Sequence, residues 1–339
     1  MATSPPRAAP VWVDCDPGHD DVMALLLAGH SPSLDLVGVS TVHGNTSGDN
    51  TFANARACLA YLALAHVPCH KGQAKPLCRP EISCPEIHGQ SGLDALDGSP
   101  LFPAAGPDAC RVADEDVRCI QAMYEAVVAA NGAGRKLTLV ATGALTNVAL
   151  LLSVYPELAD EAAHQFEVVL MGGCYGLGNT GPVAEFNIQI DPEAAKVVFE
   201  SGARLTMVPL EVTHTALATS EVLSRIGEQT PLRAKLCDLL CFFKESYRSH
   251  FGFEDPPLHD PCAVAYVIAP ALFEAEHIRV DIETGSSLCQ GQTVCDRHNL
   301  KKKPKNATVC FSMQVESFWD LMLDAIDTCE REREKQLSS

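Results

Sequence analysis

Four aspartates stand close together near the start of the chain, in the stretch VWVDCDPGHDD that covers Val11–Asp21. They are Asp14, Asp16, Asp20 and Asp21. Carboxylates at this spacing raise one another's pKa values, and their repulsion costs free energy unless a cation or a shared proton offsets it. Carboxylate oxygens are the ligands that hard divalent cations such as Ca²⁺ and Mg²⁺ prefer. The cluster therefore predicts a site for such a cation.

The local sequence places these acids where a strand ends. Residues 11–13 predict a buried strand, Pro17-Gly18 predicts a turn, and residues 20–28 predict a helix. Open α/β sheets bind their ligands at the carboxyl ends of the strands. A purely structural alternative makes Asp20 a helix N-cap and Asp21 a first-turn acid that the helix dipole favours. That alternative accounts for only two of the four acids.

A second polar segment, residues 171–191, contains Asn179, Glu185 and Asn187. Two amides and a carboxylate form a hydrogen-bonding set suited to sugar hydroxyls. The segment also matches GxGxxG at residues 176–181, but Pro182 and Glu185 follow where a dinucleotide-binding helix would present free N–H groups. We therefore expect a loop that presents these polar side chains. The alternative is a loop whose asparagines satisfy only its own turns.

Two histidines are further candidates. His259 and Asp260 precede Pro261 at a predicted helix start, where the histidine could serve as a general acid near neutral pH. Asp260 taken alone could be an N-cap before a first-turn proline. His88 precedes Gly89 and Gly92 in a long loop, residues 81–107, and this pattern is typical of a lid. A surface histidine without a role is the alternative.

Strand and helix patterns alternate along the chain. Strands are expected at residues 11–13, 34–42, 136–141, 166–171 and 205–209, with two late strands within 278–293. Helices are expected at residues 20–28, 50–65, 114–131, 191–201, 232–249, 261–269 and 312–332, with one more that ends at residue 152. This alternation predicts an α/β fold with a mainly parallel central sheet and helices on both faces. The polar residues after the strand ends would then share one cleft at the carboxyl edge of the strands.

The composition narrows the possible functions. The chain has 339 residues and a formal net charge of −18, which makes it a poor candidate for nucleic-acid binding. The basic run at residues 301–305 is expected to be a solvated loop rather than a nuclear localisation signal. No apolar run reaches transmembrane length, and the first residues lack the apolar core of a secretory signal. The 15 cysteines are therefore expected to be reduced thiols in a cytoplasmic protein without a membrane partner.

These motifs together resemble the inosine–uridine preferring nucleoside hydrolases. The resemblance rests on VDCDPGHDD, TVHGN, TGALTN, the GN…AEFN segment and HDP, in that order, and it spans Val11 to Ile326. It implies a doubly wound α/β fold with one catalytic domain at residues 11–332, between a disordered lead-in at 1–10 and a tail at 333–339. It also implies a homodimer or homotetramer. The implied reaction is hydrolysis of the N-glycosidic bond of ribonucleosides such as uridine, inosine or xanthosine, in nucleoside salvage or degradation.

The resemblance also implies a cofactor and catalytic roles. One Ca²⁺ per subunit would bind at the bottom of the pocket. Its ligands would be Asp16, Asp21, the backbone carbonyl of Thr142, and Asp260. Asp16 would also take a proton from a metal-held water as the general base, and Asp14 would orient the cluster from behind. His259 matches the residue that protonates the leaving nucleobase.

The same resemblance implies which residues bind the substrate. The ribose would be held by Asp20, Asn45, Asn179, Glu185 and Asn187. His88 matches a histidine near the nucleobase and the 5′-hydroxyl, and Tyr247 falls where the family carries a mobile tyrosine. The preferred nucleobase stays open.

Two other functions are compatible with parts of the sequence. Asp14-Cys15-Asp16 resembles the start of an aspartyl-phosphate phosphatase, but Gly18 stands where that motif usually has threonine or valine. A non-catalytic nucleoside- or Ca²⁺-binding protein could dispense with Asp16 or His259. Both residues are present, and this favours an enzyme.

Overall fold

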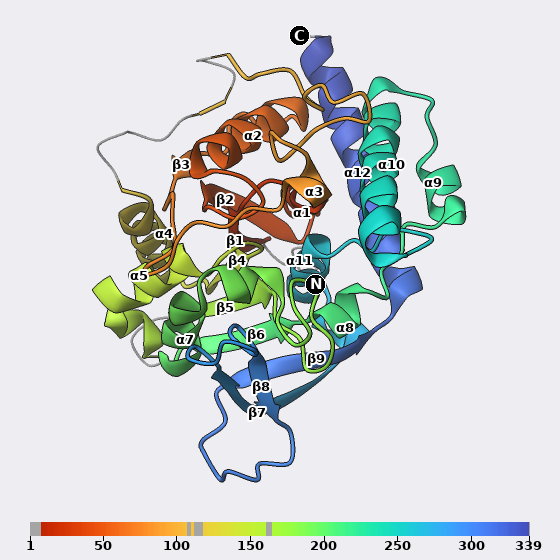
Figure 1. Cartoon of the computed structure of the whole chain (residues 1–339). Helices are drawn as coiled ribbons and strands as arrows, with labels where there is room; N and C mark the ends of the chain where they lie inside the picture. Colours follow the sequence, from red (N-terminus) through yellow and green to blue (C-terminus); the bar gives the residue numbers. More distant parts are fainter. Residues whose placement is uncertain (1–7, 107–109, 112–117, 161–164, 339) are drawn as a thin grey trace.

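The computed structural model describes residues 8–106, 110–111, 118–160 and 165–338. Its described residues form a nine-stranded sheet in the order β3-β2-β1-β4-β5-β6-β9-β7-β8 (Figure 1). The strands are β1 (Ala9–Cys15), β2 (Leu34–Thr41), β3 (Cys69–Lys71), β4 (Leu137–Ala141), β5 (Phe166–Met171), β6 (Arg204–Val208), β7 (Phe273–Ile282), β8 (Thr293–Asp296) and β9 (Ala307–Met313). Strands β1 to β6 and β9 pair in parallel, whereas β7 pairs antiparallel with both β9 and β8. The predicted mainly parallel sheet is thus confirmed.

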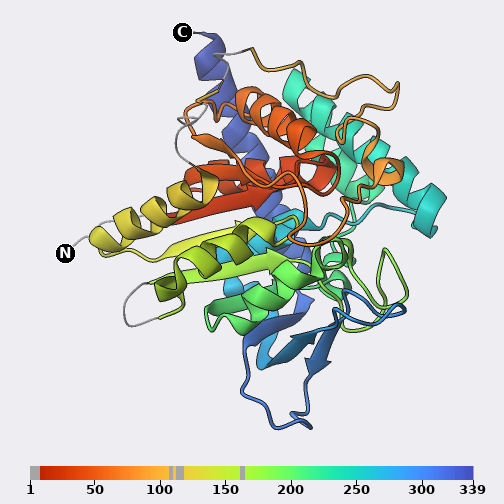
Figure 2. The same ribbon diagram turned by 60° about the vertical axis from the view of Figure 1, so that its left-hand side comes forward.

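Helices cover both faces of the sheet (Figure 2). The helices are α1 (His19–His30), α2 (Gly48–Tyr61), α3 (Pro85–His88), α4 (Cys119–Gly132), α5 (Thr146–Val154), α6 (Phe186–Ile190), α7 (Pro192–Glu200), α8 (Leu210–Thr213), α9 (Ser220–Ile226), α10 (Pro231–Phe251), α11 (Asp260–Ile268) and α12 (Val315–Leu337). Two short 3-10 helices are η1 (Pro156–Ala159) and η2 (Pro270–Leu272). Helices α1, α11 and α12 pack on one face, while α4, α5 and α7 pack on the other. Among the described residues, no helix combines the length and apolar character needed to cross a membrane.

Alternating residues of the central strands enter two separate hydrophobic cores. Val11 and Val13 belong to one core, whereas Trp12 between them belongs to the other. Leu139 and Val140 of β4 divide in the same way. Because successive side chains of a strand point to opposite faces, a strand covered on both faces is apolar at every position. This explains why residues 11–13 form a continuous apolar run that ends at Asp14.

The strand order places the polar loops together. The chain winds from β1 through β2 to β3 on one side of β1, and then returns to add β4 on the other side. Such a reversal is the topological switch point of a doubly wound sheet, where a crevice opens beyond the carboxyl ends of the strands. The loop after β1 carries Asp16, and the loop after β4 carries Thr142. The two loops therefore flank the same crevice.

The secondary structure predicted from sequence differs from the observed one mainly in the C-terminal part of the chain. Strand β9 was not expected, because its apolar residues follow the polar run at 301–305 and its parallel partner β6 lies far back in the sequence. The two late strands are present, but they are β7 and β8 rather than a pair confined to residues 278–293. Helix α12 begins at Val315 and continues through Leu337, so most of the expected tail is helical.

Smaller differences concern the ends of other elements. Strand β1 already includes residues 9 and 10 of the expected lead-in, and residues 1–7 lie outside the described part of the chain. The helix expected from residue 114 is described from Cys119 onward. Helix α2 ends at Tyr61 instead of residue 65, and Ala63 just beyond it adopts a positive φ of 60°, which no α-helix can continue.

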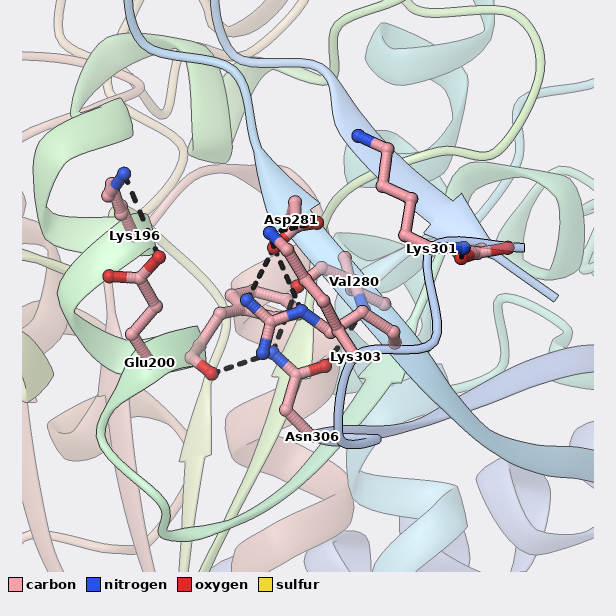
Figure 3. A network of polar contacts seen from close by, with 10 residues as sticks. Lys196, Glu200, Val280, Asp281, Lys301, Lys303 and Asn306 are labelled. Carbon is pink, nitrogen blue, oxygen red and sulfur yellow. Dashed lines mark hydrogen bonds and ion pairs between the residues drawn. The ribbon is translucent and has the colours of Figure 1, made fainter. Parts of the chain in front are cut away.

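Figure 3 shows a polar network at the edge of the sheet, between β7 and the segment before β9. The Asn306 side chain donates to the carbonyl oxygens of Phe199 and Val280 over 2.8 and 2.9 Å, and accepts from the Val280 N–H over 2.8 Å. Lys303 Nζ lies 3.1 and 3.2 Å from the two carboxylate oxygens of Asp281. The basic run at 301–305 is exposed, as expected for a solvated loop, and Lys303 anchors it to the sheet.

Candidate active site

A cavity of about 340 Å³ opens at the carboxyl edge of the sheet. Its walls come from the loops after β2, β4 and β5, from the segment before α3, and from helices α1, α3, α6, α10 and α11. Ten of the residues singled out in the sequence line it: Asp20, Asn45, His88, Thr142, Asn179, Glu185, Asn187, Tyr247, His259 and Asp260. Three others, Asp14, Asp16 and Asp21, are fully buried and lie outside this lining. The fold thus brings segments from distant parts of the sequence to one place.

Three carboxylates gather at this place. Asp20, Asp21 and Asp260 each offer an oxygen, and these oxygens lie within 4.8 Å of one another. All three residues are buried. Of the four predicted metal ligands, Asp21 and Asp260 belong to this group, and Asp20 completes it. Helix α1 supplies two members and the first residue of α11 supplies the third, so the group joins the N-terminal loop to the late His-Asp pair.

Asp16 lies beside this group with one oxygen satisfied and the other not. Its Oδ2 accepts a hydrogen bond from the Asn45 N–H over 2.8 Å, and the Asn45 side chain donates to the Asp16 carbonyl over 3.0 Å. Within the described residues, Asp16 Oδ1 is buried and has no hydrogen-bond partner. A Cβ placed on Gly143 would lie 2.5 Å from that oxygen, so only glycine fits there. A buried carboxylate oxygen without a partner is unfavourable, and a hard cation would satisfy it.

The raised pKa values of the acids in the cluster also favour a bound cation. Burial, together with the negative charges of their neighbours, raises the pKa values of Asp16 and Asp260 well above the ordinary range. Burial and the charge of Asp21 raise the pKa of Asp20 to about 7. Burial also raises the pKa of Asp21 itself. A divalent cation at this position would reverse these shifts, because it stabilises the charged forms.

Asp14 supports the cluster from beneath the cavity. Its Oδ1 accepts hydrogen bonds from Ser40 Oγ over 2.5 Å and from Asn147 Nδ2 over 2.8 Å, while its backbone carbonyl accepts from the Thr142 N–H over 2.8 Å. These bonds tie β1 to β2, to α5 and to the loop after β4. Burial raises the pKa of Asp14 to about 7. Its position suits a residue that fixes the loop geometry around Asp16.

The segment after β5 forms one wall of the cavity. It was expected to be a loop throughout, but residues 186–190 form the short helix α6. Glu185 caps that helix, because its carboxylate accepts from the N–H groups of Asn187 over 2.8 Å and Ile188 over 3.2 Å, and also from that of Gly173 over 2.9 Å. A single turn of helix has too few residues to show a helical apolar period, so the sequence pattern missed it.

The two amides of this wall are also fixed by internal bonds. Asn179 Oδ1 accepts from the Phe186 N–H over 2.9 Å. Asn187 Nδ2 donates to the carbonyl oxygen of Thr142 over 2.8 Å and to that of Met171 over 3.3 Å. Asn187 therefore contacts the same carbonyl that was expected to bind the metal. Both side chains combine a local structural bond with a place on the cavity wall.

His259 lies between two hydroxyl groups. Its Nδ1 is 2.7 Å from Thr213 Oγ1, and its Nε2 is 2.7 Å from the hydroxyl of Tyr247. Because a hydroxyl can donate or accept, either ring nitrogen can carry the proton. Burial, and secondly His214, lower the pKa of His259 well below its usual value, so the buried site favours the neutral ring before a substrate binds. Thr213 on α8, Tyr247 on α10 and His259 at the N-cap of α11 thus form one hydrogen-bonded chain that ends at the cavity.

Sequence reasoning missed part of the apolar wall. Phe243, Tyr247 and Phe251 follow one another at intervals of four residues on α10, and all three line the cavity. The rings of Phe243 and Tyr247 meet edge to face with centroids 4.7 Å apart. Only Tyr247 was singled out. Side chains four residues apart share one face of a helix, so the aromatic spacing could have identified the other two.

Comparison with known proteins places this chain within one class of hydrolases. The family model described as "Inosine-uridine preferring nucleoside hydrolase" matches residues 11–320. The chain belongs to that family. It is therefore an enzyme of the nucleoside hydrolase class, which acts on N-glycosyl bonds.

Individual relatives agree with this assignment. A "Probable ribonucleoside hydrolase" of Dictyostelium discoideum is 45% identical over 332 residues, which cover 94% of this chain and 95% of the relative. A "Pyrimidine-specific ribonucleoside hydrolase RihA" of Shewanella sp. (strain MR-7) is 41% identical over 319 residues, covering 94% and 96%. Among solved structures, a purine-preferring ribonucleoside hydrolase from Gardnerella vaginalis superposes with a TM-score of 0.83 at 27% identity, covering 95% of this chain and 99% of that one.

Proposed function

We propose that this enzyme hydrolyses the N-glycosidic bond of ribonucleosides and releases the free nucleobase and ribose. One observation carries the proposal: the unpartnered Asp16 oxygen and the three gathered carboxylates lie beside a cavity walled by amides and hydroxyls. Acids alone would suit many cation sites. Their combination with Asn45 and Asn187 suits a cation and a sugar held side by side, since amides can both donate to and accept from ribose hydroxyls.

The residues present fit one Ca²⁺ per subunit. The proposed ligands are Asp16, Asp21, the backbone carbonyl of Thr142, and Asp260. All are oxygen donors, as Ca²⁺ requires, and the partnerless oxygen of Asp16 and the raised pKa values of the acids support the assignment. When bound, Ca²⁺ would supply positive charge that orients and acidifies the attacking water.

Asp16 is the proposed general base. Its Oδ2 is held by the Asn45 N–H, so its free Oδ1 is the oxygen available to accept a proton from water. Attack would occur on a ribosyl carbon with oxocarbenium character, as in glycoside hydrolysis. The ribose would be held by Asp20, Asn45, Asn179, Glu185 and Asn187. Contacts to the sugar that strengthen as its ring flattens would lower the barrier.

His259 is the proposed acid for the leaving nucleobase. In its protonated form the ring would donate from Nε2 to the hydroxyl of Tyr247, with which it shares a 2.7 Å hydrogen bond, while that hydroxyl passes its own proton to the leaving nucleobase; the neutral ring that remains would keep the Nδ1 proton and donate it to Thr213. The aromatic rings of Phe243 and Tyr247 would stack on the base. His88 is proposed to contact the nucleobase end of the ribose.

Pyrimidine ribonucleosides are the proposed preferred substrates, with inosine and xanthosine as slower ones. Relatives about two-fifths identical to this chain are named pyrimidine-specific, whereas the purine-preferring structure is more distant in sequence. We further propose a cytoplasmic enzyme of nucleoside salvage or degradation, since its 15 free cysteines suit a reducing compartment. A homodimer or homotetramer remains a proposal that light scattering of the purified protein would test.

The test is release of ribose from purified protein in millimolar Ca²⁺, followed with a reducing-sugar assay. Uridine, cytidine, inosine and xanthosine form the panel, and the corresponding 2′-deoxynucleosides test recognition of the ribose hydroxyls. We expect ribose from uridine fastest, and much less product from the deoxynucleosides. Nucleoside binding by calorimetry without ribose from any substrate would contradict the catalytic proposal and favour a binding protein.

A further inference from the structure

Thr293 is a buried residue to which none of the roles above gives a task. It begins the edge strand β8 and lies outside the lining of the cavity. Its hydroxyl accepts a hydrogen bond from the Cys174 N–H over 2.9 Å and donates to the carbonyl oxygen of the same residue. Cys174 lies three residues beyond β5 and 119 positions before Thr293. One side chain thus pairs with both backbone groups of a distant residue, as a neighbouring strand would.

Cys174 belongs to a turn, residues 172–175, with which the cavity wall after β5 begins. Gly173 in this turn has a φ of 75°, which glycine adopts more readily than other residues. A Cβ on Gly173 would lie 2.9 Å from Thr293 Cγ2, so the two residues are packed closely together. Thr293 therefore holds the turn through hydrogen bonds and through van der Waals contact.

The turn directs one N–H group at Glu185. The Gly173 N–H donates to Glu185 Oε2 over 2.9 Å, and Gly173 directly precedes the residue that Thr293 holds. Two further bonds of the carboxylate come from the N–H groups of Asn187 and Ile188, in the helix α6 that Glu185 itself caps. The bond from Gly173 ties the carboxylate to the turn instead. Because Glu185 lines the cavity, the direction of its carboxylate there depends on the turn.

Helix α8 holds the same turn from another side. The Leu210 N–H donates to the Gly173 carbonyl oxygen over 3.0 Å, and Glu211 Oε1 accepts from the Tyr175 N–H over 3.0 Å. These bonds do not involve Thr293, so they keep the turn in contact with α8 when the hydroxyl is removed. We therefore expect such a variant to fold, with a displaced N–H group rather than a lost wall.

We propose that Thr293 is a positioning residue for Glu185. Its hydroxyl fixes the backbone at Cys174, and this keeps the Gly173 N–H aimed at the Glu185 carboxylate. That bond holds the carboxylate in its place on the cavity wall. The edge strand β8 thereby contributes to a site that it does not line. The inference rests on the proposed function only for the task of Glu185, which is contact with the ribose.

The first experiment observes the bond between Gly173 and Glu185 directly, without turnover. The dipeptide Gly-Gly occurs once in the sequence, at residues 172–173. Protein labelled at glycine with a ¹³C carbonyl and with ¹⁵N therefore gives one amide signal in an HNCO spectrum, that of Gly173. Glu185→Ala removes the acceptor and defines the signal without this hydrogen bond. Thr293→Val, which lacks only the hydroxyl, should shift the wild-type signal toward that position, and Thr293→Ser should keep the wild-type position.

Thr138→Val is the matched control. Thr138 is also a buried threonine, and its hydroxyl donates to Glu167 over 2.9 Å at the opposite ends of β4 and β5. The same chemical change there should leave the Gly173 signal and ribose release unchanged. If the Gly173 signal coincides in the wild type and Thr293→Val, the proposal is overturned. An equal shift in Thr138→Val would also overturn it, because a general loosening of the sheet would then explain the effect.

The second experiment measures ribose release. Thr293→Val should lower kcat/KM for uridine and for inosine about tenfold, the effect of one lost hydrogen bond, with recovery in Thr293→Ser. Because Thr293 acts through Glu185, adding Thr293→Val to Glu185→Ala should cause no further loss. Losses that multiply in the double variant would show that Thr293 acts independently and would overturn the proposal. If the wild type releases no ribose, the proposed function fails, whereas the Gly173 signal still decides whether Thr293 positions Glu185.

Discussion

Charged side chains cluster in two regions of the molecule. In one region opposite charges are paired, and in the other like charges are buried together. At the edge network of Arg279, Asp281 and Lys303, opposite charges meet where the Lys303 side chain is 48% exposed. At the cavity, the acids Asp16 and Asp260 share a buried space with other acids, and one Asp16 oxygen has no partner among the described residues. Paired charges near water are ordinary for protein surfaces. Like charges buried together need a ligand, so the difference separates a structural cluster from a functional one.

The pKa shifts express the same contrast. Burial and the charge of Asp21 raise the pKa of Asp20 to about 7. At the edge, burial alone would raise the pKa of Asp281, but hydrogen bonds from Arg279 and Lys303 lower it overall. The first region therefore resists ionisation, whereas the second favours it. A cation bound at the cavity would lower the pKa values of the buried acids, and experiments can detect this change.

The largest effect is expected from Asp16→Asn. The substitution removes the proposed base and weakens the cation site, so kcat for uridine should fall about 10²- to 10⁴-fold. Asp281→Asn is the matched control, because it makes the same chemical change in the paired cluster and should leave ribose release unchanged. Near-normal turnover in Asp16→Asn, with its fold verified by circular dichroism, would contradict the assignment of the base.

Addition of Ca²⁺ should stabilise the folded protein. A ligand that binds only the native state at one hundred times its Kd raises the melting temperature of a protein of this size by about 4 °C. The increase is measured by differential scanning fluorimetry after removal of metals with a chelator. Asp260→Asn should abolish most of the increase, whereas Asp281→Asn should retain it. Equal increases in both variants would place the cation elsewhere.

The stabilisation by Ca²⁺ should depend on pH. Asp20 has a pKa of about 7 in the folded chain against an ordinary value of 3.8. Without metal, the folded state holds this proton longer than the unfolded state, so the stability it provides is present below pH 3.8 and is lost as the pH rises through 7. The proposed ligands Asp16 and Asp260 have raised pKa values as well, and Ca²⁺ requires them ionised, so the gap in melting temperature between Ca²⁺ and chelator should widen from pH 5 to pH 7.5. A constant gap would argue against a cation at these acids.

Asn187→Ala should weaken recognition of the sugar for every nucleoside. The side chain holds the Thr142 carbonyl and is proposed to contact the ribose, so its loss should lower kcat/KM about tenfold or more. Uridine and inosine should be affected alike. A loss confined to one nucleobase would mean that Asn187 contacts the base instead.

Much of this site was predictable from sequence because its parts are local. The apolar run before Asp14, the Pro17-Gly18 turn and the acids that follow specify a strand, a turn and a helix by themselves. The segments that carry Asn45, Thr142 and Asn187 also follow strands, and parallel strands bring their carboxyl ends to one edge. The cavity therefore gathers residues that local patterns had already identified.

The remaining features depend on contacts between distant residues. His19 and His88 are 69 positions apart, and neither spacing nor residue type foretells that their rings meet. Strand β9 is defined by its parallel pairing with β6 and its antiparallel pairing with β7 more than by its own pattern. The internal bonds of Glu185 likewise exist only once α6 has formed. These contacts form only when the chain has folded, so a local sequence pattern cannot predict them.

The smallest effect is expected at the paired cluster. Asp281→Asn removes the charge that Arg279 and Lys303 share, but both partners remain accessible to water. Partly exposed ion pairs contribute little, so the free energy of unfolding in urea should fall by about 1 kcal/mol or less. Because the carboxylate is favoured in the folded state, this contribution is present above the ordinary pKa of aspartate and is lost as the pH falls below it. A loss that shrinks with rising pH would mean that this cluster behaves like the buried acids, and the distinction between the two regions would fail.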